Sequence, residues 1–476
     1  MPFLPFSIIR GLRRELDGTD AEILTWGCEG YIDCIEQWSE TCNTLVGAMV
    51  RVTSADEAAI VVRFATRHDV PFAVKGGGYS TSGASTTHGG IVLDLCRLRE
   101  VYVYPDSLVL AVQGGALWKD VDVAAAQYKL AVVGSTLNQI GAAGATLGGG
   151  YGWLTGEYGL AIDNLLWVRL ILADGTIVIA SEEQHPDLFW AIRGAGQCFG
   201  VAVELGLRAH IQDHHVFAGT LLFNPDKLPT LVNFANQFET ITDGRQGFWF
   251  GFAMQPSMTE CSVLVVVFYN GTQAAAQKFF SPILSLESLK SGTQMLPYDS
   301  LNGVLDRASF VAHRGHRSRV DIKYPADMRV GPRKSLRGSN ITLPLDVAFV
   351  LSIYEAFDSL LKNYPQTRDT YASRGHYYNV STLFEWNEAH LDDKIRALQK
   401  NLMDRIGVLA GIERQPNYNM SEHGTGLYAN YAGHDVPIKR IFGENLPRLR
   451  ELKKKYDPHN TFRKWHNLNA LVDSPE

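Results

Sequence analysis

The 476-residue sequence lacks both of the common nucleotide-binding signatures. It contains no GxxxxGK followed by Ser or Thr, which excludes a P-loop, and no GxGxxG with the spacing expected after a first strand. The nearest segment, Gly194 to Gly200, has one residue too many and follows residues 187–193, which have the pattern of a helix. A nucleotide site in this chain therefore needs another kind of glycine loop.

Long apolar runs and an excess of positive charge are missing as well. No segment approaches the ~18 uncharged apolar residues that span a bilayer. The apolar residues near the N-terminus are interrupted by Pro5 and followed by Arg10, which makes a poor secretory signal. The net charge of −6 and the pI of about 6.2 give no basic surface for nucleic acid or an anionic membrane. We expect a cytoplasmic protein with neither nucleic-acid nor membrane partners.

Cysteine is scarce, with six residues in the chain. Cys28, Cys34 and Cys42 lie closest together, but their spacings of six and eight residues match no common zinc motif. Scattered reduced thiols, rather than a disulfide or a metal cluster, are the simpler interpretation in a cytoplasmic protein. We therefore predict no metal site.

Glycine, by contrast, is plentiful, and its densest loop lies in VKGGGYSTSGASTTHGGIVLD, residues 74–94. Glycine lacks Cβ, so successive backbone N–H groups can turn toward one point, and neighbouring hydroxyl groups add donors. Such a loop predicts a site for an anion, most simply phosphate, although one loop alone is equally typical of a surface turn. Its candidate cofactor-binding residues are Gly76, Gly77, Gly78, Tyr79, Ser80, Gly83 and Ser85.

A second loop, IGAAGATLGGGYG at residues 140–152, shifts the balance toward a ligand. So many glycines cost chain entropy, which a fold tolerates where its backbone passes close to another group. The candidate cofactor-binding residues of this loop are Gly141, Gly144, Thr146, Gly148, Gly149 and Gly152.

Both loops carry a family resemblance when they are taken with four later segments. VKGGGYSTSGAS and AAGATLGGGYGWLTGEYGLAIDN are followed by ADGTIV, HPDLFWAIRGAGQCFGV, YANY and LRELKKKYDPHNTF. In this order and spacing, the chain from about Val46 to Trp465 resembles the berberine-bridge-enzyme-like FAD-linked oxidoreductases, and the closing FRKWHNL resembles their fungal branch. These proteins belong to the vanillyl-alcohol oxidase and p-cresol methylhydroxylase class of flavoproteins. The resemblance implies FAD, and it adds Leu137, Val201 and Asn430 to the candidate cofactor-binding residues.

The predicted fold is α+β and has two lobes, since a single core rarely grows beyond ~300 residues. Alternating and apolar strands surround helices at residues 56–67 and 116–128 in the first part, whereas longer strands dominate after about residue 209. With the resemblance, this pattern predicts an FAD-binding fold of the p-cresol methylhydroxylase type, whose substrate lobe is a large antiparallel sheet covered by helices. We expect an N-terminal segment (1–45), an FAD-binding domain (46–210), a substrate-binding domain (211–424) and a C-terminal segment (425–476) that returns to the FAD-binding domain.

The sequence departs from the family at both positions that tether FAD covalently in many relatives. Tyr79 stands where a histidine binds the 8α carbon, and Leu137, or Thr136 with a one-residue offset, stands where a cysteine binds C6. We therefore predict a non-covalent flavin, with Tyr79 near its dimethylbenzene edge as a stacking or hydrogen-bonding partner. Cys198 replaces a family asparagine in another loop and is expected to be a buried thiol.

The resemblance also points to catalytic residues. A tyrosine of the Tyr-x-Asn-Tyr segment often serves as the base in relatives, which corresponds to Tyr428. A phenol with an ordinary pKa of ~10 needs a charged or dipolar neighbour to act near neutral pH, and Arg374 could supply it. In SRGHYYNV, Arg374, His376 and Tyr378 share one face of a strand by period two, so Tyr378 is a third candidate. Each of these aromatic side chains could instead belong to the core.

Two functions follow from these observations. The first is an FAD-dependent oxidoreductase that oxidises a small organic molecule of secondary metabolism by hydride transfer to flavin N5, with molecular oxygen as acceptor. The alternative is a non-redox isomerase or cyclase that uses acid/base or pericyclic chemistry on the same fold, with FAD structural or absent. A flavin-free binding protein would leave the glycine loops without a purpose.

Overall fold

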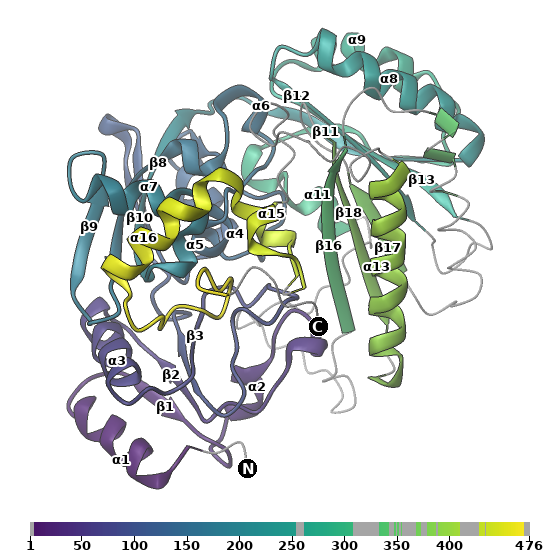
Figure 1. Cartoon of the computed structure of the whole chain (residues 1–476). Helices are drawn as coiled ribbons and strands as arrows, with labels where there is room; N and C mark the ends of the chain where they lie inside the picture. The colour runs from purple at the N-terminus through teal and green to yellow at the C-terminus, as the bar shows by residue number, and fades with distance from the viewer. Residues whose placement is uncertain are drawn as a thin grey trace.

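The computed structural model describes residues 4–253, 261–307, 333–341, 368–372, 378–386, 389–409, 428–433 and 435–470, together with a few positions between 347 and 354. The described chain forms two lobes (Figure 1). The first contains residues 4–211 and the C-terminal helices, and the second contains the strands and helices from 216 to 409. The predicted two-lobed α+β fold is confirmed.

One sheet of the first lobe carries the first glycine loop. Its strands, in spatial order, are β1 (Glu22–Leu24), β2 (Ala48–Arg51), β4 (Ile91–Asp94) and β3 (Phe72–Lys75). Strands β2 and β3 run parallel to β4, whereas β1 is antiparallel to β2. Their apolar core also includes residues of three helices, which are α1 (Phe6–Glu15), α2 (Tyr31–Ile35) and α3 (Ala55–Arg67). The first glycine loop leaves this sheet at the end of β3.

The second sheet of this lobe is antiparallel and carries the second glycine loop. Its strands are β5 (Val101–Tyr104), β6 (Val109–Gln113), β10 (Val201–Ile211), β8 (Leu165–Ile171) and β9 (Ile177–Ser181), with β7 (Leu130–Val132) also paired to β10. The helices around it are α4 (Trp118–Ala126), α5 (Ala142–Leu147), α6 (Thr155–Tyr158) and α7 (Pro186–Ala195). The C-terminal helices α15 (Ile438–Phe442) and α16 (Leu446–Tyr456) join the same apolar core, and α16 packs on α7 (Figure 1). The chain end thus completes the lobe in which the chain begins.

The second lobe is built on antiparallel strands, as predicted. Its larger sheet contains β12 (Gln246–Ala253), β13 (Ser262–Tyr269), β11 (Val216–Phe223) and β14 (Lys290–Ser291), with β15 (Gln294–Leu296) on β11. A three-stranded sheet of β16 (Arg333–Ile341), β18 (Tyr378–Trp386) and β17 (Arg368–Ala372) continues beside it, because β17 lies against β12. The covering helices are α8 (Leu228–Ile241), α9 (Gln273–Phe279), α10 (Ser281–Leu284) and α13 (Asp392–Leu409), while α11 (Gly303–Arg307) packs on β11 nearer the first lobe (Figure 1).

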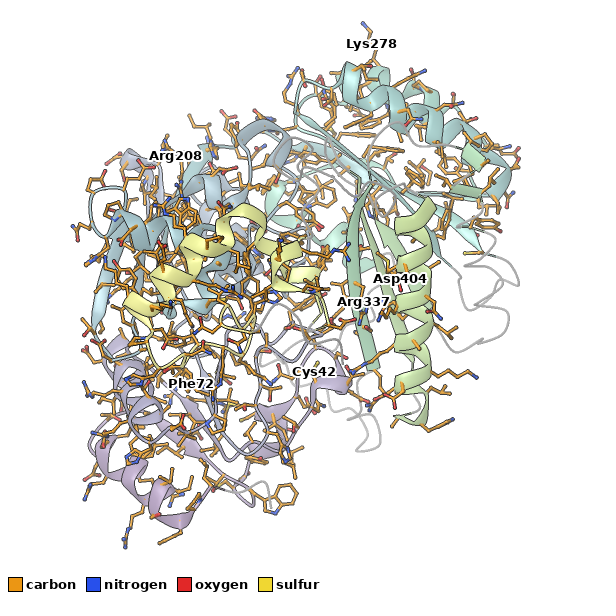
Figure 2. The ribbon with its side chains drawn as sticks, viewed as in Figure 1. Cys42, Phe72, Arg208, Lys278, Arg337 and Asp404 are labelled. Atoms are coloured by element: carbon orange, nitrogen blue, oxygen red, sulfur yellow. The ribbon has the colours of Figure 1, made fainter. Side chains whose placement is uncertain are left out.

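Strand β16 is fastened to the first lobe at three successive points. The hydroxyl of Ser39 donates to the carbonyl of Lys334 (2.7 Å) and accepts from its N–H (2.8 Å). Thr81 Oγ1 accepts from the N–H of Leu336 (3.2 Å), and Arg337, at the border of the lobes in Figure 2, forms an ion pair with Asp435 (2.8 Å). These contacts place β16 beside the first glycine loop.

The described residues show no sign of a metal site, a disulfide or a membrane span. None of the six cysteines, all of which are described, forms a disulfide. Among the described residues, His, Cys, Asp and Glu side chains form no cluster able to hold a metal ion. None of the described helices combines the length and apolarity that crossing a bilayer requires.

Candidate cofactor and substrate site

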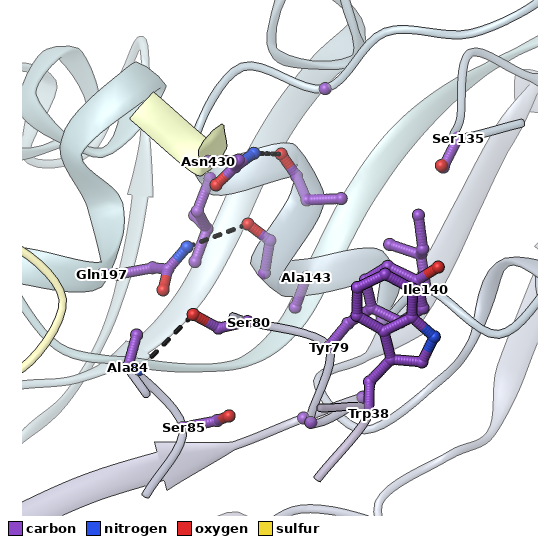
Figure 3. A pocket seen from close by; sticks show the side chains of 18 of the residues that line it. Trp38, Tyr79, Ser80, Ala84, Ser85, Ser135, Ile140, Ala143, Gln197 and Asn430 are labelled. Carbon is purple, nitrogen blue, oxygen red and sulfur yellow. Dashed lines mark hydrogen bonds between the residues drawn. The ribbon is translucent and has the colours of Figure 1, made fainter. Parts of the chain in front are cut away.

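A cavity of about 330 Å³ lies between the lobes and is bordered by both glycine loops (Figure 3). The first lobe contributes residues 76–81 and part of the segment 135–153, the second lobe contributes residues of β12, β13, β16 and β18, and the C-terminal segment contributes part of the ranges 428–431 and 462–465. Segments distant in the sequence therefore meet around one space.

The two glycine loops touch each other through their backbones. A Cβ on Gly77 would lie 2.5 Å from the backbone nitrogen of Gly141, and a Cβ on Gly141 would lie 2.6 Å from the nitrogen of Gly77. Real Cβ atoms essentially never approach another atom so closely. Glycine is thus required at both positions because the backbones of the two loops are in direct contact there.

Most of the predicted cofactor-binding residues line the cavity. They are Gly76, Gly77, Gly78, Tyr79, Ser80, Ser85, Leu137, Gly141, Gly144, Val201 and Asn430. Ser80 and Asn430 are visible in Figure 3, where Asn430 Nδ2 donates to the carbonyl of Ala145 (3.0 Å) and Ser80 Oγ accepts from the N–H of Ala84 (3.4 Å).

The other predicted residues lie away from the cavity surface, and for three of them the reason is visible. Gly148 packs on the Asn430 side chain, Gly149 on the ring of Tyr428, and Gly152 on the carbonyl of Gly134. These three glycines make room for protein atoms rather than for a ligand. The remaining two are Gly83, which has a positive φ of 76° in its turn, and Thr146, which is fully buried in α5.

Tyr428 lies in the cavity wall at the centre of a cluster of three tyrosines. Its ring centroid lies 5.1 Å from that of Tyr151 and 4.7 Å from that of Tyr431, and the hydroxyls of Tyr151 and Tyr431 are hydrogen-bonded at 2.7 Å. The Tyr428 oxygen accepts from the N–H of Gly150 (3.2 Å) and from Asn430 Nδ2 (2.8 Å). Both donors face the same phenolic oxygen.

The other two predicted catalytic residues are only partly covered by the structure. Arg374 lies outside the described residues, as does His376. Tyr378 is the first residue of β18, where its backbone pairs with Ile341, but its side chain is outside the described part. Ser381 of the same strand lines the cavity, so β18 borders the site.

Sequence reasoning missed Trp38, which stacks on Tyr79 in the cavity wall (Figure 3). The two ring centroids are 4.0 Å apart and the planes differ by 18°. Trp38 belongs to the N-terminal segment that we expected to lie outside the FAD-binding domain. An isolated tryptophan has no spacing or motif that could have identified it.

The part of the cavity toward the second lobe is apolar. Its wall is formed by Trp153, Trp249, Leu264, Val266 and Leu305. Among the described residues that line the whole cavity, Lys464 is the only one with a charged side chain. A ligand bound at this end would therefore meet mainly hydrocarbon and indole surfaces.

Trp153 is held in that wall by a buried polar chain. Its indole N–H donates to Asn302 Oδ1 (2.8 Å), and Asn302 Nδ2 donates to Asp122 Oδ2 (3.0 Å). Burial, and to a lesser degree the nearby Asp299, raises the pKa of Asp122 well above its usual range. These hydrogen bonds join Asp122 of α4, in the first lobe, to Asn302 of the second lobe.

Cys198 does not line the cavity and is a buried thiol, as expected. Its side chain is fully buried and donates to the carbonyl of His466 (3.2 Å). Burial raises the pKa of this thiol to about 12, so it stays protonated at neutral pH.

Comparison with known proteins identifies the family. Residues 46–181 match the family described as FAD binding domain, and residues 427–469 match the family described as berberine and berberine like. The FAD-linked oxidoreductase pgmH of Aspergillus terreus is 31% identical over 480 residues, which cover 96% of this chain and 95% of that protein. The FAD-linked oxidoreductase hasG of Aspergillus fumigatus is 28% identical over 467 residues, which cover 92% of this chain and 95% of that protein.

Solved structures share the fold along nearly the whole chain. 6-Hydroxy-D-nicotine oxidase from Arthrobacter nicotinovorans has a TM-score of 0.78 at 23% identity, with 96% of this chain and 98% of that chain covered. A variant of berberine bridge enzyme has a TM-score of 0.76 at 16% identity, with coverage of 98% and 99%. By its sequence and its fold, this chain belongs to the berberine-bridge-enzyme-like FAD-linked oxidoreductases.

Proposed function

We propose that this enzyme binds FAD non-covalently and oxidises a small, uncharged organic molecule of secondary metabolism, with molecular oxygen as the electron acceptor. The proposal rests above all on one observation. The cavity that both glycine loops border also contains Tyr428, whose oxygen faces two N–H donors.

The residues around the cavity fit FAD. The Gly76–Gly77–Gly78 turn and Gly141 present backbone without Cβ atoms to the cavity, and a Cβ at Gly77 or Gly141 would collide with the facing loop. Hydroxyl groups of Ser80, Thr81 and Ser85 lie along the same wall, as a phosphate-bearing cofactor requires. FAD, when bound, would accept a hydride from the substrate and pass the electrons to oxygen.

Tyr428 is the group that we assign to proton removal from the substrate. Two N–H donors directed at its oxygen stabilise negative charge there, which is what a phenol needs to serve as a base. Asn430 positions it, because Asn430 Nδ2 is itself fixed to the carbonyl of Ala145 (3.0 Å). Arg374 and Tyr378 remain proposed partners from the opposite lobe.

Non-covalent attachment is supported by the composition of the cavity wall. Tyr79 and Leu137 both line the cavity, at the two positions where many relatives carry their tethers. None of the described lining residues is a histidine or a cysteine. Cys198, the cysteine of the later glycine-containing segment, does not line the cavity either.

The apolar wall supports a substrate without charge. Trp249, Leu264 and Val266 would bury a hydrocarbon or aromatic surface favourably, at about 25 cal/mol for each Å² removed from water. A charged substrate would lose its hydration there, because none of these three residues carries a charge and Lys464, the one charged side chain of the described lining, belongs to the C-terminal segment. The assignment to secondary metabolism comes from the resemblance to fungal relatives.

Acid precipitation of the purified protein tests the cofactor. We expect a flavin spectrum in the visible range and release of the flavin to the supernatant, whereas colour in the pellet would contradict non-covalent binding. Absence of flavin, together with failure of the flavin-free protein to bind added FAD, would contradict the cofactor assignment.

Turnover is tested with a panel of uncharged aromatic metabolites, monitored by bleaching of the flavin without oxygen and peroxide release with oxygen. Tyr428→Phe is expected to lower turnover by about 10²- to 10⁴-fold, the usual contribution of a positioned base. Tyr431→Phe is the matched control, since it removes a hydroxyl from the same cluster that contacts Tyr151. Substrate conversion with an unchanged flavin spectrum would instead favour the non-redox isomerase or cyclase.

A further inference from the structure

We infer that Trp38 and Tyr79 act together as a stacked aromatic pair that holds the flavin ring in place of the missing covalent tether. The inference rests on the proposed FAD site. It assigns a cofactor-site role to the N-terminal segment, which lies before the part of the chain that matches the FAD-binding family, residues 46–181.

The geometry of the pair is that of a formed stack. The centroids are 4.0 Å apart with an interplanar angle of 18°, and both side chains are half-buried in the cavity wall. Tyr79 follows the three glycines directly, where the family places its 8α tether. A lone tyrosine at this position could turn away from the cavity, so Trp38 would act as the positioning residue that fixes the Tyr79 ring.

Trp38 is itself held from two sides. Its backbone N–H donates to the carbonyl of Gly78 (2.9 Å), which connects the N-terminal segment to the glycine turn. The buried ammonium of Lys75 donates to the carbonyls of Cys34 (2.6 Å) and Glu36 (3.0 Å), just before Trp38. The indole is therefore placed before any ligand arrives, which reduces the ordering cost of binding.

Lys334 adds a charge to the pair. Its ammonium lies 4.5 Å from the centroid of a Trp38 ring, within the range of a cation–π interaction, and the residue is almost completely buried. Lys334 belongs to β16, whose backbone is bonded to Ser39, the residue after Trp38. The second lobe thus braces the pair as well.

The test compares the affinity of flavin-free wild type and variants for FAD. Binding is measured by the quenching of flavin fluorescence as FAD is titrated with protein. We expect wild type to bind, and Trp38→Leu and Tyr79→Leu each to raise the Kd for FAD on the order of tenfold. Trp38→Phe keeps a ring in the stack and should bind within about threefold of wild type. Trp26→Leu is the matched control, because Trp26 lies in the same N-terminal segment, is 54% exposed and is absent from the described cavity wall.

The double variant separates a shared role from general damage. If the two rings act as one unit, Trp38→Leu combined with Tyr79→Leu should weaken FAD binding little more than either single change. Additive losses, or a Trp38→Leu protein that binds FAD as wild type does, would overturn the inference. If Trp38→Leu does not fold, the decision passes to Tyr79→Leu and Trp38→Phe, and an unchanged Kd in Tyr79→Leu overturns it. Failure of wild type to bind FAD would reject the proposed function itself, which is a distinguishable result.

Discussion

Replacement of Gly77 by alanine is the sharpest test of the contact between the two glycine loops. The new Cβ would lie 2.5 Å from the nitrogen and 2.8 Å from the Cα of Gly141. These are backbone atoms, so no change of rotamer relieves the overlap. The loops must separate by about 1 Å to restore an ordinary contact.

The expected cost follows from that displacement. Overpacking of this kind costs ~1–3 kcal/mol, partly offset by ~0.4–1 kcal/mol because alanine reduces the entropy of the unfolded chain. For a lobe of about 200 residues, each lost kcal/mol lowers Tm by about 2–4 °C. Because Gly77 lines the cavity, its displaced N–H should also weaken FAD binding by about tenfold or more.

The assay is thermal unfolding of the flavin-free protein, followed by titration with FAD. Gly144→Ala is the stability control, since Gly144 lies in helix α5 and a Cβ added to it would have no atom within 4 Å. There alanine should leave Tm unchanged or raise it, because alanine stabilises a helix by up to ~1 kcal/mol relative to glycine. A Gly77→Ala protein that melts and binds FAD as wild type does would refute the close contact of the loops.

Three further substitutions test other parts of the structure. Asp122→Asn should remove a pH dependence of stability. Because the pKa of Asp122 is raised in the folded state, its stabilising effect is full below the unfolded pKa and is lost as pH rises through the folded pKa. Between about pH 5 and pH 8, the free energy of unfolding measured in urea should therefore fall more for wild type than for the variant. Lys453→Met should cost ~3–5 kcal/mol in the same measurement, because Asp457, 2.7 Å away and fully buried, would keep an unpaired charge, and a loss below about 1 kcal/mol would contradict this. Ser39→Ala should cost ~1–3 kcal/mol by removing the two hydrogen bonds between this hydroxyl and the backbone of Lys334, and an unchanged Tm would show that the β16 attachment does not depend on the Ser39 hydroxyl.

Much of the fold was predictable from local patterns. Residues 56–67 have helical apolar spacing and form α3, which Ser54 caps by accepting from the N–H of Glu57 (3.1 Å). The long apolar run at 262–269 forms the fully buried strand β13. Such patterns are readable because periodic burial is imposed on each segment separately.

Glycine shows where local reasoning stops. A missing Cβ indicates that something lies close, but the sequence does not say whether it is a ligand or the protein itself. Gly141 both lines the cavity and contacts Gly77. Gly148 and Gly152, from the same loop, instead pack on Asn430 and on the carbonyl of Gly134. The prediction treated all these glycines alike because their local sequences are alike.

The sequence alone determined the order of the motifs, the two glycine loops, and the presence of Tyr79 and Leu137 at the positions that we predict to match the tethers of relatives, because each of these depends only on which residue follows which. Tertiary structure alone decided the contacts between distant segments. Trp38 reaches Tyr79, and the Tyr428 oxygen reaches the N–H of Gly150, 278 residues away. Such contacts depend on how the sheets pack and on buried bonds such as those of Lys75 and Ser39, and the free energy that selects one packing is shared by the whole chain rather than written in any one segment.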